Sequence, residues 1–139
     1  MQISIREYTE SDYRALSSMS DDVWSTKIAC IAAGLRNYDG KIERCYLAEK
    51  NGIIVGFIYG HVLPNRLLFP ELLYVLPEYR NKGIATKLLD EFEKTSGCTT
   101  SLIFYNKALH DFYFKRDYCH GENLEVAMKL IPCNQEEQS

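Results

Sequence analysis

Residues 75–94, VLPEYRNKGIATKLLDEFEK, change in character halfway along their length. An apolar stretch ends at Pro77, a basic turn containing Gly83 follows, and apolar residues then recur at helical spacing. Residues 67–76 before this helix and residues 99–105 after it are rich in strand-forming side chains. Because a helix that joins two strands of one sheet is a crossover connection, the sequence predicts that these two strands run parallel.

The N-terminal part of the chain predicts one strand and two helices. Residues 2–7 alternate between polar and apolar side chains, as a short strand does. Thr9 and Asp12 have the spacing of a helix-capping pair, and we expect the helix that they open to end near Ser20. A second helix is expected over residues 22–35, where apolar residues again recur at helical spacing.

Three consecutive antiparallel strands are expected next. Asn51 and Gly52 separate the first two, and this pair readily adopts the positive φ angles of a two-residue hairpin turn. The strand at 67–76 is the third. After the parallel strand we expect a helix from Asn106 and a last strand over residues 122–131, whose side chains alternate in character. The predicted fold is therefore of the α/β class, with a mixed, mostly antiparallel sheet flanked by helices.

Composition favours one soluble domain. With 139 residues, of which 46% are hydrophobic, the chain can build a single core, which we assign to residues 1–131, with a flexible tail at 132–139. The longest apolar stretch, residues 53–63, falls short of the roughly 20 residues of a membrane span, so no membrane partner is expected. A formal net charge of -3 lacks the basic excess of a nucleic-acid-binding protein. An N-terminus with early charges and five scattered cysteines without a CxxC pair favour a reducing, cytoplasmic location.

The turn at residues 80–85 has the chemistry of an anion site. The following helix begins at about Gly83, and its first turn presents unpaired N–H groups at the positive end of the helix dipole. Gly83 and Ala85 are small enough for an anion to approach the backbone, and Arg80 and Lys82 add positive charge. A solvated surface turn is the alternative interpretation. The spacing matches neither the GxxxxGK loop nor GxGxxG, which argues against those two nucleotide-binding motifs.

This turn closely resembles the acetyl-coenzyme-A signature of the GNAT N-acetyltransferases, V-x-P-x-Y/H-R/Q-x-x-G-I/V/L-G/A. The matching residues are Val75, Pro77, Tyr79, Arg80, Gly83, Ile84 and Ala85. Residues 106–118, NKALHDFYFKRDY, resemble a more degenerate segment of the same family, N-x-x-A-x-x-F/L-Y-x-x-x-G-F. They depart from it at Leu109, Asp117 and Tyr118, where the family often has alanine, glycine and phenylalanine. The expected order of elements is that of a single GNAT-like domain, in which the fourth and fifth strands splay apart to admit the cofactor.

The resemblance implies a binding site for acetyl-CoA as the acetyl donor. Its pyrophosphate would lie on the backbone amides of the signature loop, and its pantetheine arm would lie along the fourth strand near Leu73 and Val75, like an added strand. The hydroxyl of Thr86 would add a contact, and Asn106 and Tyr113 would complete the cofactor side. The loop residues are Arg80, Asn81, Lys82, Gly83, Ile84 and Ala85. No metal is implied, and the three histidines show no ligand spacing.

The resemblance also implies direct transfer of the acetyl group to an amine. Glu71 is the leading candidate for the general base, because a neutral amine must attack the thioester carbonyl. An ordinary strand-edge glutamate is the alternative, in which case His61, Tyr74 or a water relay would serve as base. Tyr113 matches the family's tyrosine that protonates the departing thiolate. Packing within its helix is the alternative for Tyr113, with water or a neighbouring tyrosine as the proton source.

The function implied by the resemblance is that of an acetyl-CoA-dependent N-acetyltransferase, an acyltransferase acting on a primary amine of a small molecule. Residues 60–86, GHVLPNRLLFPELLYVLPEYRNKGIAT, are similar to aminoglycoside acetyltransferases in particular. Two alternatives stay open: acetylation of a protein or peptide amine, and a regulatory module that binds acetyl-CoA without turnover. A homodimer is a further expectation, since dimers are common among similar proteins.

Overall fold

Residues 2–19, 28, 31–32, 34–35 and 38–132 are described in a computed structural model of the chain. The chain divides into two compact units, Met1–Phe104 and Tyr105–Ser139. The first unit holds the sheet and its covering helices, and the second holds a short helical segment and the C-terminal stretch.

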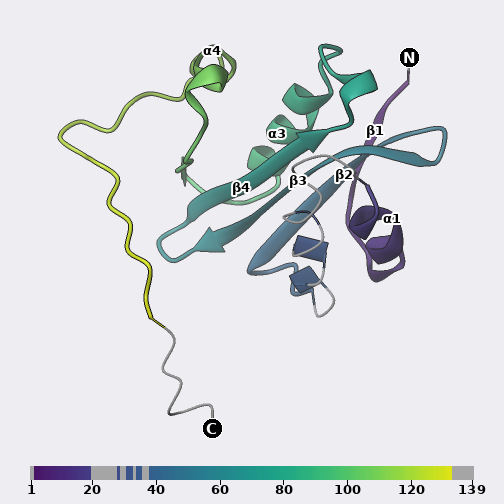
Figure 1. The fold of residues 1–139 in the computed structure, drawn as a ribbon, viewed down its shortest axis with the longest axis horizontal. Coiled ribbons are helices and arrows are strands. Elements are labelled where there is room, and N and C mark those ends of the chain that lie inside the picture. The colour runs from purple at the N-terminus through teal and green to yellow at the C-terminus, as the bar shows by residue number, and fades with distance from the viewer. Residues whose placement is uncertain (1, 20–27, 29–30, 33, 36–37, 133–139) are drawn as a thin grey trace, which may run out of the picture. The chain divides into compact units, whose positions relative to one another are not determined.

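The first unit is built on a mixed sheet. Within the described residues the sheet has five strands in the order β1-β2-β3-β4-β5 (Figure 1). Pairing from β1 to β4 is antiparallel, and β4 and β5 are parallel. The strands are β1 (Ser4–Glu7), β2 (Glu43–Lys50), β3 (Ile53–Leu63), β4 (Leu67–Val75) and β5 (Thr100–Ser101). This arrangement confirms the predicted α/β fold, including its parallel fourth and fifth strands.

The hairpin between β2 and β3 turns where the sequence predicts it. Asn51 has a φ of 52° and Gly52 a φ of 79°, which are the positive angles of a type I′ turn. Lys50 and Ile53 form the last pair of the ladder before this turn. The twist of such a turn matches that of the strands, so the two residues set the register of the hairpin.

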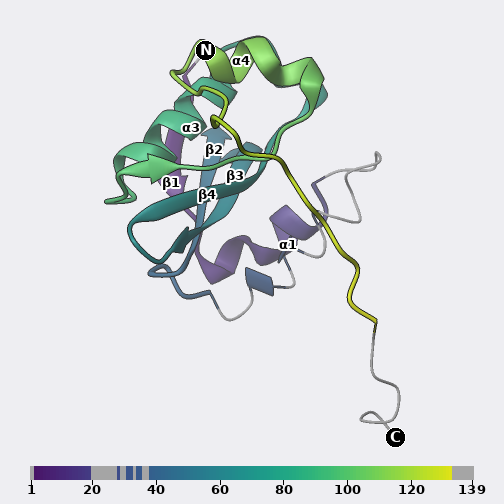
Figure 2. The ribbon, with the colours of Figure 1, turned by 90° about the vertical axis from the view of Figure 1, so that its left-hand side faces the viewer.

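Two helices of the first unit cover opposite faces of the sheet (Figure 2). A 3-10 turn, η1 (Glu10–Asp12), leads into α1 (Tyr13–Ser17), so this helix starts after Thr9 as predicted and ends before Ser20. A second turn, η3 (Pro77–Tyr79), precedes α3 (Ile84–Lys94), which is the predicted crossover helix. Most of the helix expected over 22–35 lies outside the described residues. No helix of the described chain is both long and apolar enough to cross a membrane.

Alternating side chains of the strands form a core on each face. On the α1 face, Leu16 packs in a buried cluster with Leu47 and Phe57. On the α3 face, the helix buries Ile84, Leu88, Leu89 and Phe92, and the ring of Phe92 meets that of Tyr46 at 6.3 Å. Each large apolar side chain that leaves water contributes about 1.5–3 kcal/mol, so the two layers hold the sheet and the helix α3 as one body.

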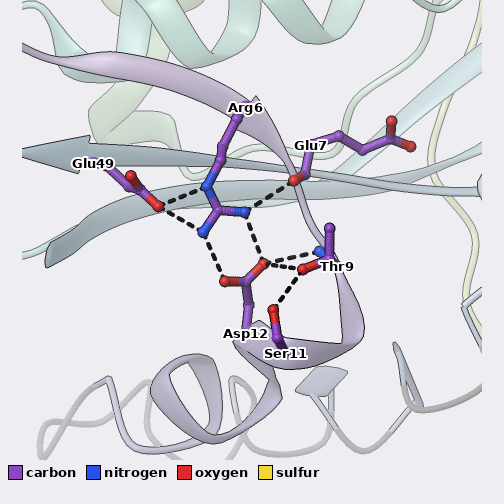
Figure 3. Close-up of polar contacts among 6 residues, drawn as sticks. All are labelled: Arg6, Glu7, Thr9, Ser11, Asp12 and Glu49. Atoms are coloured by element: carbon purple, nitrogen blue, oxygen red, sulfur yellow. Dashed lines mark hydrogen bonds and ion pairs between the residues drawn. The ribbon is translucent and has the colours of Figure 1, made fainter. Parts of the chain in front are cut away.

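Arg6 ties the N-terminal strand to its neighbours (Figure 3). Its guanidinium donates to both carboxylate oxygens of Asp12, at 2.8 and 2.7 Å, and to Glu49 at 2.6 Å. The same Asp12 accepts a hydrogen bond from the Thr9 amide at 2.8 Å, as a capping residue does. Hydrogen bonding from Arg6 lowers the pKa of the nearly buried Asp12, although desolvation opposes this shift. Strand β1, the start of α1 and strand β2 are thus joined through one cation.

The second unit begins with the predicted helical segment. The side chain of Asn106 accepts from the Ala108 amide at 2.9 Å and so caps η4 (Lys107–Leu109), which leads into α4 (His110–Phe114). After α4 the chain turns at Asp117, whose φ is 68°. The Tyr118 amide donates to the Tyr113 carbonyl at 3.3 Å, which is the closing bond of a Schellman motif. Aspartate therefore occupies a left-handed position that glycine adopts without a steric penalty.

Two predicted strands differ from the structure. The strand expected at 99–105 is limited to Thr100–Ser101, because its chain leaves β4 after two pairs. The strand expected at 122–131 is wrong, since the described residues there form no strand and Figure 1 draws no arrow in this stretch. Its alternating apolar side chains are largely exposed, and a strand needs a neighbour for its backbone groups and a cover for its apolar face.

Candidate active site

Strand β4 has an edge that β5 covers only at one end. The parallel pairing comprises Leu67 with Thr100 and Leu68 with Ser101, and the Leu102 amide adds a bond of 2.9 Å to the Leu68 carbonyl. Beyond Leu68, no strand of the described chain pairs with β4 on this side. This confirms the predicted splay of the two strands and leaves backbone groups that an extended ligand can bind like an added strand.

Glu71 occupies a β-bulge. Tyr59 pairs with Leu72 and Gly60 pairs with Pro70, so Glu71 is the extra residue between them on β4. A side chain at Gly60 would place its Cβ 2.3 Å from a backbone oxygen of β4, so only glycine fits opposite the bulge. Bulges often re-aim a side chain next to a functional site. A glycine in one strand and a proline in the next are the sequence signals that could have predicted this bulge.

The carboxylate of Glu71 meets the imidazole of His61 at 3.0 Å. Both side chains keep access to solvent, with exposed fractions of 36% for Glu71 and 26% for His61. The His61 ring packs edge-on against Tyr59 at 5.1 Å, and the Tyr59 hydroxyl donates to Glu43 at 3.1 Å. Burial, followed by the charge of Glu43, raises the pKa of Tyr59. The carboxylates of Glu43 and Glu71 thus flank Tyr59 and His61 across β2, β3 and β4. Glu71, which can accept a proton, is held in place by its contact with His61. Tyr74, another candidate base, lies in the buried core.

The turn before α3 has an open backbone and two cations, Arg80 and Lys82. Gly83, the N-cap of α3, has a φ of 81° and no side chain with which to cap the first turn. A Cβ at this position would meet nothing within 4 Å. Arg80 donates from Nε to the Val75 carbonyl at 2.7 Å, and in the described part of the chain neither Arg80 nor Lys82 pairs with a carboxylate. The positive end of the helix dipole, with two cations that no carboxylate of the described residues neutralises, makes this turn suitable for an anion.

The predicted cofactor residues of the first unit follow one another along β4 and into α3. Leu73 and Val75 lie on the part of β4 that β5 does not cover. Ile84 is buried, so its backbone rather than its side chain is available at the helix start. Ala85 and Thr86 complete the first turn of α3.

The other two predicted residues belong to the second unit. Asn106 uses its side chain as the cap described above. Tyr113 is only 8% exposed, and its ring packs against those of Tyr105, Phe112 and Tyr118, at 5.6, 5.0 and 5.5 Å. Burial raises the pKa of Tyr113. The hydroxyl therefore stays protonated at neutral pH, which is the state that a proton donor requires.

Lys50 lies near the turn before α3, although it is not part of the signature segment. The ammonium of Lys50, at the end of β2, lies 5.7 Å from the centre of the Tyr79 ring, and that of Lys82 lies 5.8 Å from the same ring. The hairpin residue is distant from the motif in sequence, and the fold brings the two turns together. Across the described residues, no group of three or more potential ligands could hold a metal ion.

Comparisons with known proteins agree with this geometry. The model of the acetyltransferase (GNAT) domain matches residues 41–119. No curated protein matches the chain. Among solved structures, a ribosomal-protein-alanine N-acetyltransferase from Brucella melitensis biovar Abortus 2308 is 16% identical, with 93% of this chain and 100% of that chain covered and a TM-score of 0.72.

Two further structures were solved with the coenzyme. The aminoglycoside N-acetyltransferase AAC(6')-Iy in complex with CoA is 15% identical, with 95% of this chain and 96% of that chain covered and a TM-score of 0.71. An acetyltransferase from Clostridium acetobutylicum with acetyl-CoA is 17% identical, with 91% and 96% covered and a TM-score of 0.67. At such identities the likeness shows the fold. Since the domain model spans more than half of the sequence, including both the turn at Gly83 and Tyr113, the chain belongs to the GNAT acetyltransferase family.

Proposed function

We propose that this protein is an acetyl-CoA-dependent N-acetyltransferase that moves an acetyl group directly to a primary amine of a small molecule. The main support for the proposal is that an uncovered strand edge leads directly into an uncapped helix start. The uncovered edge of β4 ends at Val75, and the chain then forms an uncapped, cation-flanked helix start at Gly83. An extended arm followed by a pyrophosphate matches these two features in order.

The pantetheine arm would bind the backbone of Leu73 and Val75. The Leu76 amide donates to Val55 on β3, and backbone groups of successive residues point to opposite sides of a strand. Val75 and Leu73 therefore direct their amides and carbonyls away from β3, toward the uncovered edge. Arg80 already donates to the Val75 carbonyl from that side. Binding through the backbone would hold the arm whatever the neighbouring side chains are.

The pyrophosphate would lie against the amides of the turn from Arg80 to Ala85. Gly83 leaves open space beside them, and the charge of Arg80 has no competing carboxylate among the described residues. Thr86 carries its hydroxyl in the same helical turn and is proposed as a further contact on the strength of the family resemblance. Asn106 is proposed as a further cofactor residue on the strength of the family resemblance alone.

Glu71 is the proposed general base. Its carboxylate, oriented by His61, would take the proton that an alkylammonium must lose before its nitrogen attacks the thioester carbonyl. The new C–N bond forms as the C–S bond breaks, and the electron pair leaves on the coenzyme sulfur. Tyr113 is the proposed acid that returns a proton to this sulfur.

The carboxylates near Glu71 favour a cationic acceptor. Glu43 accepts from Tyr59, whose ring packs against His61, the partner of Glu71, so a second negative charge lies in the neighbourhood of the proposed base. AAC(6')-Iy, a similar fold, has been solved with a bisubstrate analog named CoA-S-monomethyl-acetylneamine. This supports a small amine as acceptor. The ribosomal-protein-alanine N-acetyltransferase of the same fold supports the second candidate, a protein or peptide amine.

The test is an acetylation assay that follows thiol release from acetyl-CoA with a panel of small polyamines, amino sugars and peptides. We expect turnover with small amines, and we expect Glu71→Gln to lower kcat by at least about 100-fold while leaving acetyl-CoA affinity unchanged. Glu78→Gln, at an exposed glutamate of η3, is the matched control. Turnover with peptides alone would favour the second candidate. Binding of acetyl-CoA without turnover of any acceptor would favour a regulatory module.

A further inference from the structure

Two lysines from different turns gather on one aromatic ring. Lys50 ends β2 just before the hairpin turn, and Lys82 lies in the turn before α3. Their ammonium groups lie 5.7 and 5.8 Å from the centre of the half-buried Tyr79 ring. Both distances fall within the range of cation–π attraction, so one ring attracts both charges.

The two charges lack a counterion in the described part of the chain. Neither lysine forms an ion pair there, and the nearest acidic residue in sequence to Lys50, Glu49, is engaged by Arg6. Glu78 precedes Tyr79 and is exposed, without an ion pair to either lysine. Two like charges on one ring repel each other, and a bound anion would remove that repulsion.

The proposed cofactor carries a phosphate that the turn does not account for. In the proposed function, the amides at Gly83 and the guanidinium of Arg80 take the pyrophosphate. Acetyl-CoA carries one more phosphate group, on the 3′ carbon of its ribose, and such a monoester is largely dianionic at neutral pH. Lysine binds phosphate as a mobile point charge, which suits a group at the solvent-exposed end of a ligand.

We infer that Lys50 and Lys82, arranged by Tyr79, form a subsite for the ribose 3′-phosphate of acetyl-CoA. This inference rests on the proposed function, because it requires that acetyl-CoA binds at the turn before α3. It assigns a specificity role to Lys50, which lies outside the signature segment. The subsite distinguishes the coenzyme from its 3′-dephospho form.

The experiment measures the affinity of acetyl-CoA and of acetyl-3′-dephospho-CoA by titration calorimetry for the wild-type chain and three variants. Lys50→Met keeps the apolar stem on the Tyr79 ring and removes the charge. We expect this variant to bind acetyl-CoA about fivefold more weakly, the loss of one exposed ion pair, and to bind the dephospho form as the wild type does. Lys50→Arg keeps the charge and should restore most of the difference. Lys94→Met, at the far end of α3, is the control and should change neither affinity.

The outcomes separate the inference from the function on which it rests. If Lys50→Met weakens both ligands equally, the lysine acts on the pyrophosphate and the subsite is wrong. If the wild type binds both ligands equally well, the subsite is wrong and the proposed function stands. If the wild type binds neither ligand, both the proposed function and the subsite fail. Thermal unfolding of each variant shows whether a change in affinity comes from a change in folding.

Discussion

The helices α1 and α3 begin in opposite ways. The turn that leads into α1 is satisfied by its own chain, because Asp12 accepts from the Thr9 amide and its charge is paired with Arg6. Helix α3 begins at Gly83, which offers no capping side chain, and Arg80 beside it pairs with no carboxylate of the described chain. A helix start therefore indicates a ligand site where the chain itself provides no capping side chain and no counterion.

The largest expected effect is on acetyl-CoA affinity, when a side chain is added at the N-cap of α3. Gly83→Val should lower acetyl-CoA affinity at least about 100-fold, or ~2.7 kcal/mol, because a β-branched side chain would fill the space that the phosphate needs. Gly52→Val is the matched control. Gly52 has nearly the same φ, 79° against 81°, and equally open space around a new Cβ, but it lies in the hairpin turn.

The two glycine variants separate strain from ligand binding. Each should lose about 1–2 kcal/mol of folding free energy, since a β-branched residue is strained at positive φ. Only Gly83→Val should lose affinity in calorimetry. Equal affinities for the two variants would mean that the phosphates bind elsewhere and that the contrast between the two helix starts has no functional meaning.

A substitution at the capped start of α1 should lower stability and leave acetyl-CoA affinity unchanged. We expect Asp12→Ala to lower the free energy of unfolding by about 2 kcal/mol, because the partly exposed Arg6 and the Thr9 amide lose their shared, nearly buried acceptor. Acetyl-CoA affinity should not change. Denaturant unfolding with an unchanged m-value measures the first, and calorimetry the second. Glu49→Gln, which leaves the contact between Arg6 and Asp12 in place, should cost less than half as much.

Lowering the pH should reduce the difference in unfolding free energy between Asp12→Ala and the wild type. The pKa of Asp12 is lower in the folded chain than in the unfolded chain, where it is about 3.9. Its contribution is therefore complete above that value and is lost as the pH falls through the folded pKa. In unfolding measurements from pH 7 down to pH 3, the difference in unfolding free energy between the two proteins should shrink once the pH falls below about 4. A gap that stays constant over this range would show that packing, and not the charge, stabilises the capped start.

The sequence predicted what local chemistry controls. The hairpin at Asn51 and Gly52, the start of α1 after Thr9 and the crossover helix after Gly83 depend on turn residues and helical spacing, and all three are confirmed. The roles of Glu71 and Tyr113 stay predictions. The bulge at Glu71 and the approach of Lys50 to Tyr79 depend on pairing between separate segments, which no single stretch encodes.

The C-terminal stretch shows the limit of periodicity. Residues 122–131 alternate as a strand does, yet the described chain has no strand there. Alternation specifies which side chains would share a face, but it supplies neither the partner strand nor the layer that covers it. A prediction from alternation alone therefore fails where tertiary partners decide.

A substitution at Tyr113 tests whether this buried side chain also donates a proton to the coenzyme sulfur. We expect Tyr113→Phe to lower kcat at least about 10-fold, or ~1.4 kcal/mol, because a thiol is a tolerable leaving group and general acid catalysis adds modestly. Folding and acetyl-CoA affinity should change little, since one oxygen is removed. Tyr105→Phe removes a hydroxyl from a ring 5.6 Å away and is the control. A loss of stability without a loss of kcat in Tyr113→Phe would leave only a packing role.

The smallest effect on stability is expected after α4, where Asp117 adopts a left-handed conformation that is unfavourable for a residue other than glycine. Asp117 holds a φ of 68° so that the Tyr118 amide can reach the Tyr113 carbonyl. Asp117→Gly removes the steric cost of that angle but adds freedom to the unfolded chain, and we expect a net gain of about 0.5 kcal/mol. Lys115→Gly, two residues earlier at a φ of -69°, should instead lose about 1 kcal/mol. Hydrogen exchange of the Tyr118 amide reports on this turn directly, and it should slow in the first variant and quicken in the second. If both variants quicken exchange, the aspartate side chain itself stabilises the turn, and this helix end, like the start of α1, is satisfied by its own residues.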